Sequence, residues 1–203
     1  MKIICIGRNY SEHAKEMSSL VPAEPIFFLK PDTALIKDNQ PFYYPEFSKE
    51  IHHEVELVLK INKTGKNIQT QFANKYYDEI GIGIDFTARD LQDECKKKGL
   101  PWEKAKAFDG AAPLGKFINK KQFADQQNIN FHLTINGNKV QKGNTKDLLF
   151  SFDTIISYIS KYFMLKTGDL IYTGTPEGVG PVKIGDRLEA YIENEKLLDF
   201  EIK

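Results

Sequence analysis

Short runs of strand-forming residues recur along the chain and limit it to folds built mainly from β-strands. The runs are rich in Ile, Leu, Val and Phe, and turn residues such as Gly, Pro and Asn separate one run from the next. Asn136-Gly137, which lies between two of the runs, is typical of a two-residue type I′ hairpin. The expected strands cover Lys2–Gly7, Ile26–Lys30, Ile51–Ile61, Glu79–Ala88, Ile129–Ile135, Lys139–Lys142, Leu170–Thr173, Arg187–Ile192 and Leu197–Ile202.

Helical patterns are fewer than strand patterns. Arg89–Lys98 is expected to form a polar helix that ends before Gly99, and Tyr10–Ser19 a helix whose N-cap is Asn9 or Ser11. A third helix, over residues 151–162, is amphipathic and has apolar residues at helical spacing: Phe152, Ile155, Ile156, Ile159 and Phe163. We therefore predict an α+β, mostly β fold class, with residues 1–203 in one compact domain.

The composition excludes several classes of protein. Lys and Arg together number 28, as do Asp and Glu, so the chain lacks the basic excess of a nucleic-acid binder. A hydrophobic content of 41% argues against disorder, and no apolar run approaches the ~18 residues of a membrane span. Cys5 and Cys95 are too far apart for a metal motif, and the N-terminus lacks the features of a signal peptide. We therefore expect reduced thiols in a cytoplasmic protein.

Glu54 and Glu56 are the strongest candidates for a metal site. Side chains alternate along a strand, so these two carboxylates should share one face, with Val55 and Leu57 on the other. Hard cations such as Mg²⁺, Mn²⁺ or Ca²⁺ prefer oxygen ligands. The pair alone does not distinguish a metal site from a solvated strand face, because Glu-x-Glu sequences are common.

Asp85 interrupts the otherwise apolar run from Ile80 to Phe86. A buried carboxylate is costly unless a cation or a metal ion compensates its charge. Asp85 is therefore either a third metal ligand or the partner of a salt bridge with Arg89, and the periodicity favours neither alternative.

His13 and Glu16 are three residues apart in a predicted helix, so their side chains can form a hydrogen bond on one face. A carboxylate that orients an imidazole and raises its basicity is a frequent arrangement for a general base. The alternative for such a pair on a polar helix is solvated surface charge.

Together, these residues resemble the fumarylacetoacetate hydrolase family, and most of all its short, single-domain acylpyruvase and oxaloacetate decarboxylase branch. The matching segments occur in the expected order over nearly the whole chain. They are Gly7-Arg8-Asn9-Tyr10 with His13 and Glu16, Phe28-Leu29-Lys30-Pro31, His52-His53-Glu54-Val55-Glu56-Leu57, Asp85-Phe86-Thr87-Ala88-Arg89-Asp90-Leu91-Gln92, Lys98-Gly99-Leu100-Pro101-Trp102 with Lys106, and Thr173-Gly174-Thr175-Pro176-Glu177-Gly178-Val179-Gly180.

The resemblance implies a β-roll or barrel-like fold with a few short helices, a single catalytic domain over residues 1–203, and a homodimer. It also implies the roles of the site residues. Glu54, Glu56 and Asp85 would hold Mg²⁺ or Mn²⁺. His13 and Glu16 would activate water from a lid helix. Arg89, Gln92, Lys106 and Thr175 would contact the substrate. Lys106 would also steady charge during catalysis, and Arg89 would also have a structural or charge-balancing role. Arg8 stays a weak candidate. The chain departs from the family's pattern at residues 108–113, where relatives often carry hydroxyl or thiol side chains.

The implied substrate is a small anionic keto acid, with neither nucleic acid nor membrane as a partner. The leading hypothesis is hydrolysis of the C–C bond of acylpyruvates, such as acetylpyruvate or fumarylpyruvate, to pyruvate and a carboxylic acid, together with oxaloacetate decarboxylation. The alternatives are an isomerase, either an oxaloacetate keto–enol tautomerase or a 2-hydroxyhepta-2,4-diene-1,7-dioate isomerase, and a non-catalytic module that binds dicarboxylates.

Overall fold

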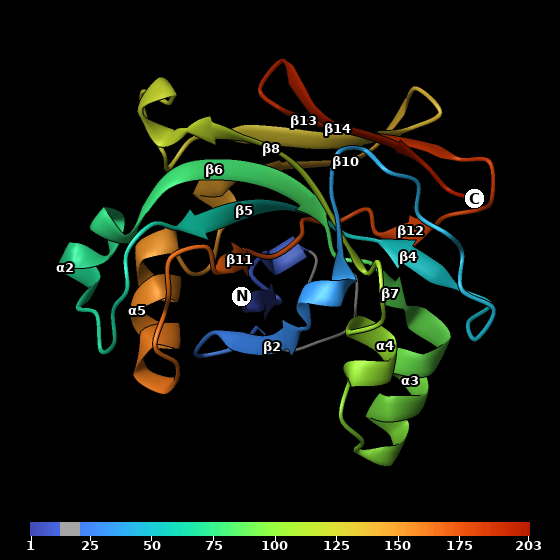
Figure 1. The fold of residues 1–203 in the computed structure, drawn as a ribbon, viewed down its shortest axis with the longest axis horizontal. Coiled ribbons are helices and arrows are strands. Elements are labelled where there is room, and N and C mark those ends of the chain that lie inside the picture. Colours follow the sequence, from blue (N-terminus) through green and yellow to red (C-terminus); the bar gives the residue numbers. More distant parts are fainter. Residues whose placement is uncertain (13–20) are drawn as a thin grey trace.

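A computed structural model describes residues 1–12 and 21–203 of the chain, and strands dominate it (Figure 1). The largest sheet has seven strands in the order β2-β1-β11-β5-β6-β8-β3, and it is strongly curved. Its strands are β1 (Ile3–Gly7), β2 (Ile26–Lys30), β3 (Leu35–Ile36), β5 (Val55–Ile61), β6 (Tyr77–Ile84), β8 (Ala112–Asn119) and β11 (Leu170–Tyr172).

Two smaller sheets complete the β structure. A four-stranded sheet in the order β10-β9-β13-β14 packs on β6 and β8, and Figure 1 shows it as a second layer beside the curved ribbon. A three-stranded sheet has the order β12-β4-β7. The strands are β4 (Ile51–His53), β7 (Thr87–Ala88), β9 (Asn130–Ile135), β10 (Asn138–Asn144), β12 (Gly180–Pro181), β13 (Arg187–Ile192) and β14 (Glu195–Glu201).

The helices of the described ranges are short. α5 (Phe152–Tyr162) begins at an N-cap, Ser151, whose hydroxyl accepts a hydrogen bond from the backbone of Thr154. α3 (Arg89–Lys98) ends at Gly99 in the left-handed conformation, so both ends match the sequence prediction. The others are α2 (Thr70–Ala73), α4 (Glu103–Lys106) and 3₁₀ turns at 32–34, 74–76, 120–122 and 145–147. None of the helices described is long and apolar enough to cross a membrane.

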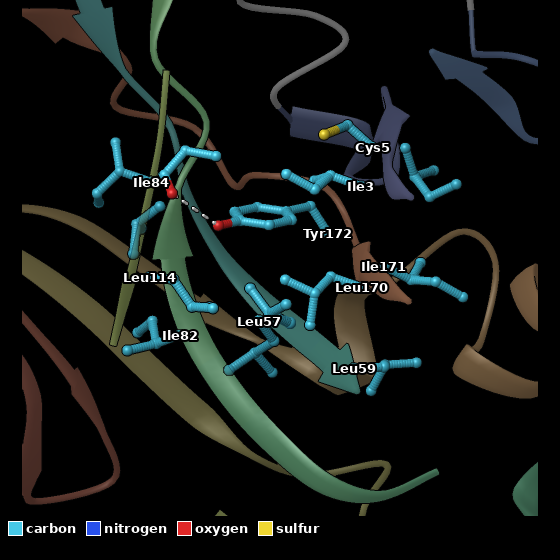
Figure 2. Packing of buried hydrophobic residues seen from close by; sticks show 14 of the residues in the cluster. Ile3, Cys5, Leu57, Leu59, Ile82, Ile84, Leu114, Leu170, Ile171 and Tyr172 are labelled. Carbon is cyan, nitrogen blue, oxygen red and sulfur yellow. Dashed lines mark hydrogen bonds between the residues drawn. The ribbon is translucent and has the colours of Figure 1, made fainter. Parts of the chain in front are cut away.

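The core lies where β5 and β6 run through the middle of the large sheet. Figure 2 shows the ring of Tyr172 among apolar side chains from β1, β5, β6 and β11, and the tyrosine hydroxyl donates to the carbonyl of Pro113 or Ala112, each 3.4 Å away. Glycine is required at position 83, because a Cβ there would lie 2.7 Å from the Tyr172 ring. The buried thiols of Cys5 and Cys95 are unpaired, as expected.

The structure confirms most of the predicted elements. The Asn136-Gly137 hairpin joins β9 to β10, and both turn residues have the positive φ that a type I′ turn requires, 52° and 79°. Strand β8 was not predicted, because Pro113 and Gly115 are residue types that are rare in strands and interrupt its apolar pattern. The helix expected over Tyr10–Ser19 lies mostly outside the described residues.

Two predictions of long strands are wrong in one respect. The run Ile51–Ile61 breaks at Glu54 into β4 and β5, and the run Glu79–Ala88 breaks at Asp85 and Phe86 into β6 and β7. The two breaks face each other, since the Asp85 amide donates to the Glu54 carbonyl at 2.8 Å. At these breaks both segments pass from the large sheet to the three-stranded sheet, where β4 pairs with β7. This change of sheet depends on tertiary packing.

Candidate functional site

The two facing breaks bring three carboxylates together. Glu54 lies between β4 and β5, Glu56 lies in β5, and Asp85 directly follows β6. One ligand oxygen from each lies within 4.8 Å of the others, and all three side chains are buried. The alternation that was expected to place Glu54 and Glu56 on one face of a strand does not apply, because Glu54 is outside the strand. The two carboxylates nevertheless converge.

Lys106, the last residue of α4, connects two of these carboxylates. Its Nζ lies 2.8 Å from Glu54 Oε2 and 2.9 Å from Asp85 Oδ2. Burial alone would lower the pKa of Lys106, but the charges of Asp85 and Glu54 outweigh it and raise that pKa. The side chain is therefore a buried ammonium ion that stays protonated at neutral pH.

A second buried lysine, Lys30, was not proposed as a site residue from the sequence. Its Nζ lies 2.8 Å from Asp85 Oδ1 and also donates to the carbonyls of Phe86 and Lys106. Lys30 is the buried position of β2, a strand whose apolar residues are mostly partly exposed. A lysine that ends such an apolar run is the signal that could have identified it.

Arg89 contacts Glu54, so the alternative of a salt bridge between Asp85 and Arg89 is wrong. The Arg89 guanidinium lies 2.7 Å from Glu54 Oε1 and donates to Gln92 Oε1 at 2.5 Å. Thr87 donates to the same Glu54 oxygen at 3.0 Å. The first turn of α3 thus fixes one side of the Glu54 carboxylate.

Glu56 differs from the other two carboxylates, because no Lys or Arg of the described ranges pairs with it. Its Oε2 accepts the backbone N–H of Gly174 at 2.7 Å. Burial, and then the negative charge of Asp85, raise the pKa of Glu56 well above its usual range, although the Gly174 N–H opposes this. A nearby cation would reverse that shift.

Thr175 is held by a buried network that the sequence did not reveal. The side-chain amide of Gln141 in β10 donates to Thr175 Oγ1 at 2.9 Å and to the Pro176 carbonyl at 3.0 Å. Its oxygen accepts from the Val55 amide at 3.0 Å and lies 2.9 Å from His53 Nδ1. Because Gln141 occupies an acceptor position of the Thr175 hydroxyl, the hydroxyl proton is left to donate elsewhere.

The three carboxylates line a pocket of about 530 Å³, a volume that includes space open to solvent. In Figure 1, helices α3 and α4 lie together at one end of the curved sheet, and both contribute residues to the pocket lining. The pocket is lined by all the predicted metal and substrate residues that the structure describes, namely Glu54, Glu56, Asp85, Arg89, Gln92, Lys106 and Thr175. His13 and Glu16 lie outside the described residues, so their role stays a prediction.

The donor set fits a divalent cation. The three side chains offer only carboxylate oxygens, which Mg²⁺ and Mn²⁺ prefer. Asp85 Oδ1 is buried, and although Lys30 lies near it, no hydrogen bond within the described part of the chain is directed at it. A buried oxygen with an ion pair but no well-directed hydrogen bond is unusual, and it leaves a lone pair of Asp85 Oδ1 available to a metal ion.

Comparisons with known proteins identify the family of this chain. The family described as "Fumarylacetoacetate (FAA) hydrolase C-terminal" matches residues 2–201. The mitochondrial oxaloacetate tautomerase FAHD1 of Mus musculus is 44% identical over 99% of this chain and 91% of its own length. The oxaloacetate tautomerase YcgM of Escherichia coli K12 is 44% identical over 97% and 90%.

A solved structure adds a bound metal. The fumarylpyruvate hydrolase of Pseudomonas aeruginosa, in complex with Mn²⁺ and pyruvate, is 35% identical, superposes with a TM-score of 0.93, and matches 100% of this chain and 89% of its own. The fold class predicted from the resemblance is confirmed. This chain belongs to the fumarylacetoacetate hydrolase family.

Proposed function

We propose that this protein is a Mg²⁺- or Mn²⁺-dependent enzyme that interconverts the keto and enol forms of oxaloacetate, with hydrolysis of acylpyruvates as a second activity. This order reverses the one favoured by the sequence. The relatives named oxaloacetate tautomerase are 41–44% identical to the chain, whereas the fumarylpyruvate hydrolase is 35% identical. The hydrolase is kept as the second candidate because its structure holds both the metal and pyruvate.

The observation that carries the proposal is the convergence of three buried carboxylate oxygens within 4.8 Å in a pocket lined by cations. Burying three acidic groups together is expensive, and a site that only stabilised the fold would not need them. A divalent cation bound there, beside Arg89 and Lys106, gives a place for a carboxylate and an adjacent keto oxygen.

In the proposed site Glu54, Glu56 and Asp85 hold the metal. When bound, Mg²⁺ or Mn²⁺ would act as a Lewis acid that stabilises negative charge developing on the keto oxygen. Thr175, whose proton is directed away from Gln141, would donate to the substrate carboxylate, and the Lys106 ammonium would add positive charge close to it. Gln92, held by Arg89, would orient the substrate from the other side.

The proposed activities require different proton transfers from His13 and Glu16. Tautomerisation moves a proton between C3 and the keto oxygen and breaks no C–C bond. Hydrolysis needs a water molecule deprotonated by a general base, which attacks the C4 carbonyl before the C3–C4 bond breaks. Decarboxylation of oxaloacetate needs no attacking water. We propose that the His13–Glu16 pair serves as the proton shuttle in the first case and as the base in the second.

The test uses purified protein that has been stripped with EDTA and reloaded with Mg²⁺ or Mn²⁺. Three readouts separate the activities: loss of enol-oxaloacetate absorbance, release of CO₂ from oxaloacetate, and pyruvate formed from acetylpyruvate and fumarylpyruvate. We expect fast loss of the enol that requires the metal. A metal-independent rate, or no effect on any substrate, would contradict the proposal, and binding without turnover would favour the dicarboxylate-binding module.

Matched variants locate the chemistry. Glu56→Gln should abolish the activity and the thermal stabilisation by Mg²⁺. Glu79→Gln removes a half-exposed carboxylate of the neighbouring strand β6, which pairs with Lys60 outside the pocket, and should keep both. His13→Ala should abolish hydrolysis of acylpyruvates but preserve the response to Mg²⁺ and much of any decarboxylation. If hydrolysis survives that change undiminished, the assigned base is wrong.

The expected homodimer and cytoplasmic location also stay proposals. Light scattering coupled to gel filtration would give the oligomeric state, and fractionation of the source cells would give the location. A monomer at micromolar concentration would contradict the first of these.

A further inference from the structure

Arg8 has a backbone conformation that an arginine rarely adopts. It follows β1 with a φ of 59°, in the left-handed region, where the Cβ of an L-residue crowds the following carbonyl oxygen. Most other non-glycine residues with positive φ in the described ranges are Asn or Asp, which tolerate it. Such strain persists only where the surrounding structure imposes it, and it occurs often at functional sites.

The next residue, Asn9, imposes this conformation. Its fully buried side chain donates to the carbonyls of Phe150 at 3.0 Å and Thr173 at 2.8 Å, and it accepts from the Phe150 amide at 2.7 Å. Gly174 packs directly on it, because a Cβ at position 174 would lie 2.6 Å from Asn9 Cβ. Arg8 is therefore held at the wall of the same pocket that contains the three carboxylates.

Lys96 lines this pocket from another element. It lies seven residues after Arg89 and four after Gln92, so the three share one face of α3, and all three line the pocket. Burial, and then the like charges of Arg89 and Arg8, lower the pKa of Lys96, although Asp93 opposes them. Arg8 and Lys96 thus line one pocket from two different parts of the fold, the end of β1 and helix α3.

Neither Arg8 nor Lys96 takes part in the ion pairs formed within residues 1–12 and 21–203, whereas Arg89 and Lys106 are paired with Glu54 and Asp85. Four cationic side chains line the pocket and a fifth, the buried Lys30, contacts Asp85, so five positive groups face three carboxylates and leave an excess of two positive charges. A divalent cation would add two more. This excess is more than a substrate with a single carboxylate can balance.

We propose that Arg8 and Lys96 form a subsite for a second carboxylate of the substrate, so that the enzyme selects keto dicarboxylates over keto monocarboxylates. The inference rests on the proposed function, because it assumes that the first carboxylate binds at the metal end of the pocket. The planar guanidinium of Arg8 suits a carboxylate, and the strained backbone holds it in place before substrate arrives. The apolar side chains of Ile26, Phe28 and Trp102 line the same pocket and would cover the carbon chain.

The test compares oxaloacetate with 2-oxobutanoate, in which a methyl group replaces the terminal carboxylate. KM is measured for enol-oxaloacetate with Mg²⁺, and 2-oxobutanoate is used as a competitive inhibitor. Arg8→Gln and Lys96→Gln should each raise KM for oxaloacetate about tenfold to hundredfold, the loss of one charge-assisted hydrogen bond, and leave the inhibition constant of 2-oxobutanoate unchanged. Lys97→Gln, an exposed neighbour outside the pocket, is the matched control and should change neither value.

Arg8→Lys keeps the charge, and its KM should stay within a few-fold of that of the wild type. Equal effects of Arg8→Gln on both compounds, or no effect on either, would overturn the subsite. If the wild-type protein shows no tautomerase activity, the proposed function fails, and the subsite is then judged by thermal shift in Mg²⁺. Oxaloacetate must stabilise the wild type more than 2-oxobutanoate does, and Arg8→Gln must remove the difference. Equal stabilisation by both acids would reject the inference.

Discussion

Lys30→Met tests whether the buried carboxylates are held in place by the buried cations around them. The Lys30 side chain is completely buried, and its Nζ lies 2.8 Å from Asp85 Oδ1. It also donates to the carbonyls of Phe86 and Lys106, so it connects β2 to the carboxylate group and to α4. Methionine has nearly the same length and fills the same space, but it removes the charge and all of these donors.

The loss of folding stability expected for Lys30→Met can be estimated from its contacts. Removing one partner of a buried ion pair typically costs about 3–5 kcal/mol, because the remaining charge is left uncompensated. Asp85 keeps its contact with Lys106 at 2.9 Å, so the lower end of that range, about 3 kcal/mol, applies. For a protein of this size each kcal/mol corresponds to a Tm change of about 2–4 °C, so Tm should fall by about 6–12 °C.

The assay is thermal unfolding followed by circular dichroism, in EDTA, for the wild type, Lys30→Met and Lys98→Met. Lys98 forms an exposed ion pair with Glu94 at 2.7 Å in α3, so it gives the same chemical change at the surface and should leave Tm nearly unchanged. The double variant Lys30→Met, Asp85→Asn should lose less than the sum of its single variants, because it removes both charges. Equal Tm values for Lys30→Met and Lys98→Met would refute the reasoning.

Three further outcomes are expected. Gly174→Ala should lower Tm and weaken the response to Mg²⁺, because its φ of 102° is unfavourable for alanine and the new methyl group meets Asn9. Gln141→Leu should lower the free energy of unfolding, measured with urea, by about 3 kcal/mol or more, because several buried partners each lose a hydrogen bond worth about 1–3 kcal/mol. Asp199→Asn tests pH dependence. Arg187 lowers the pKa of Asp199 to about 2, from 3.8, so its stabilisation should be present at neutral pH and disappear as the pH falls toward 2. Melting curves over that range would show it, and a constant difference in Tm would contradict it.

Local rules predicted the elements that local contacts determine. The hairpin at Asn136-Gly137 needs positive φ at both residues, and helix α5 needs a hydroxyl at Ser151, and both requirements can be read from neighbouring residues. The breaks at Glu54 and Asp85 follow instead from the exchange of partners between two sheets. Strand periodicity contains no information about that exchange.

The site was predictable to the extent that its residue types are unusual. Acidic residues in apolar runs pointed to Glu54, Glu56 and Asp85, and the resemblance added Lys106, Gln92 and Thr175. The sequence did not predict Lys30 and Gln141, because their partners are far away along the chain. Gln141 is 86 residues from Val55, and Lys30 is 76 from Lys106. Only the folded chain shows that these side chains complete the site.

The strand breaks also explain why the carboxylates meet. Residues two apart in a regular strand are separated by about 6.6 Å along it, so an unbroken strand would spread Glu54 and Glu56 along its face. Leaving the strand at Glu54 and Asp85 lets these side chains turn toward Glu56, and one oxygen of each then lies within 4.8 Å of the others. The fold thus gives up ladder hydrogen bonds at two positions in exchange for a compact set of ligands.

Such a set would be unstable without cations, and the chain provides them. Lys30, Lys106 and Arg89 contact Asp85 and Glu54, so three positive side chains balance the three carboxylates before any metal binds. This balance predicts that EDTA abolishes the proposed activity but leaves the fold intact, with near-ultraviolet circular dichroism unchanged. A protein that needed its metal to compensate these charges would unfold on chelation, as metal-dependent folds do. Unfolding in EDTA would show that the buried lysines and Arg89 do not neutralise the site.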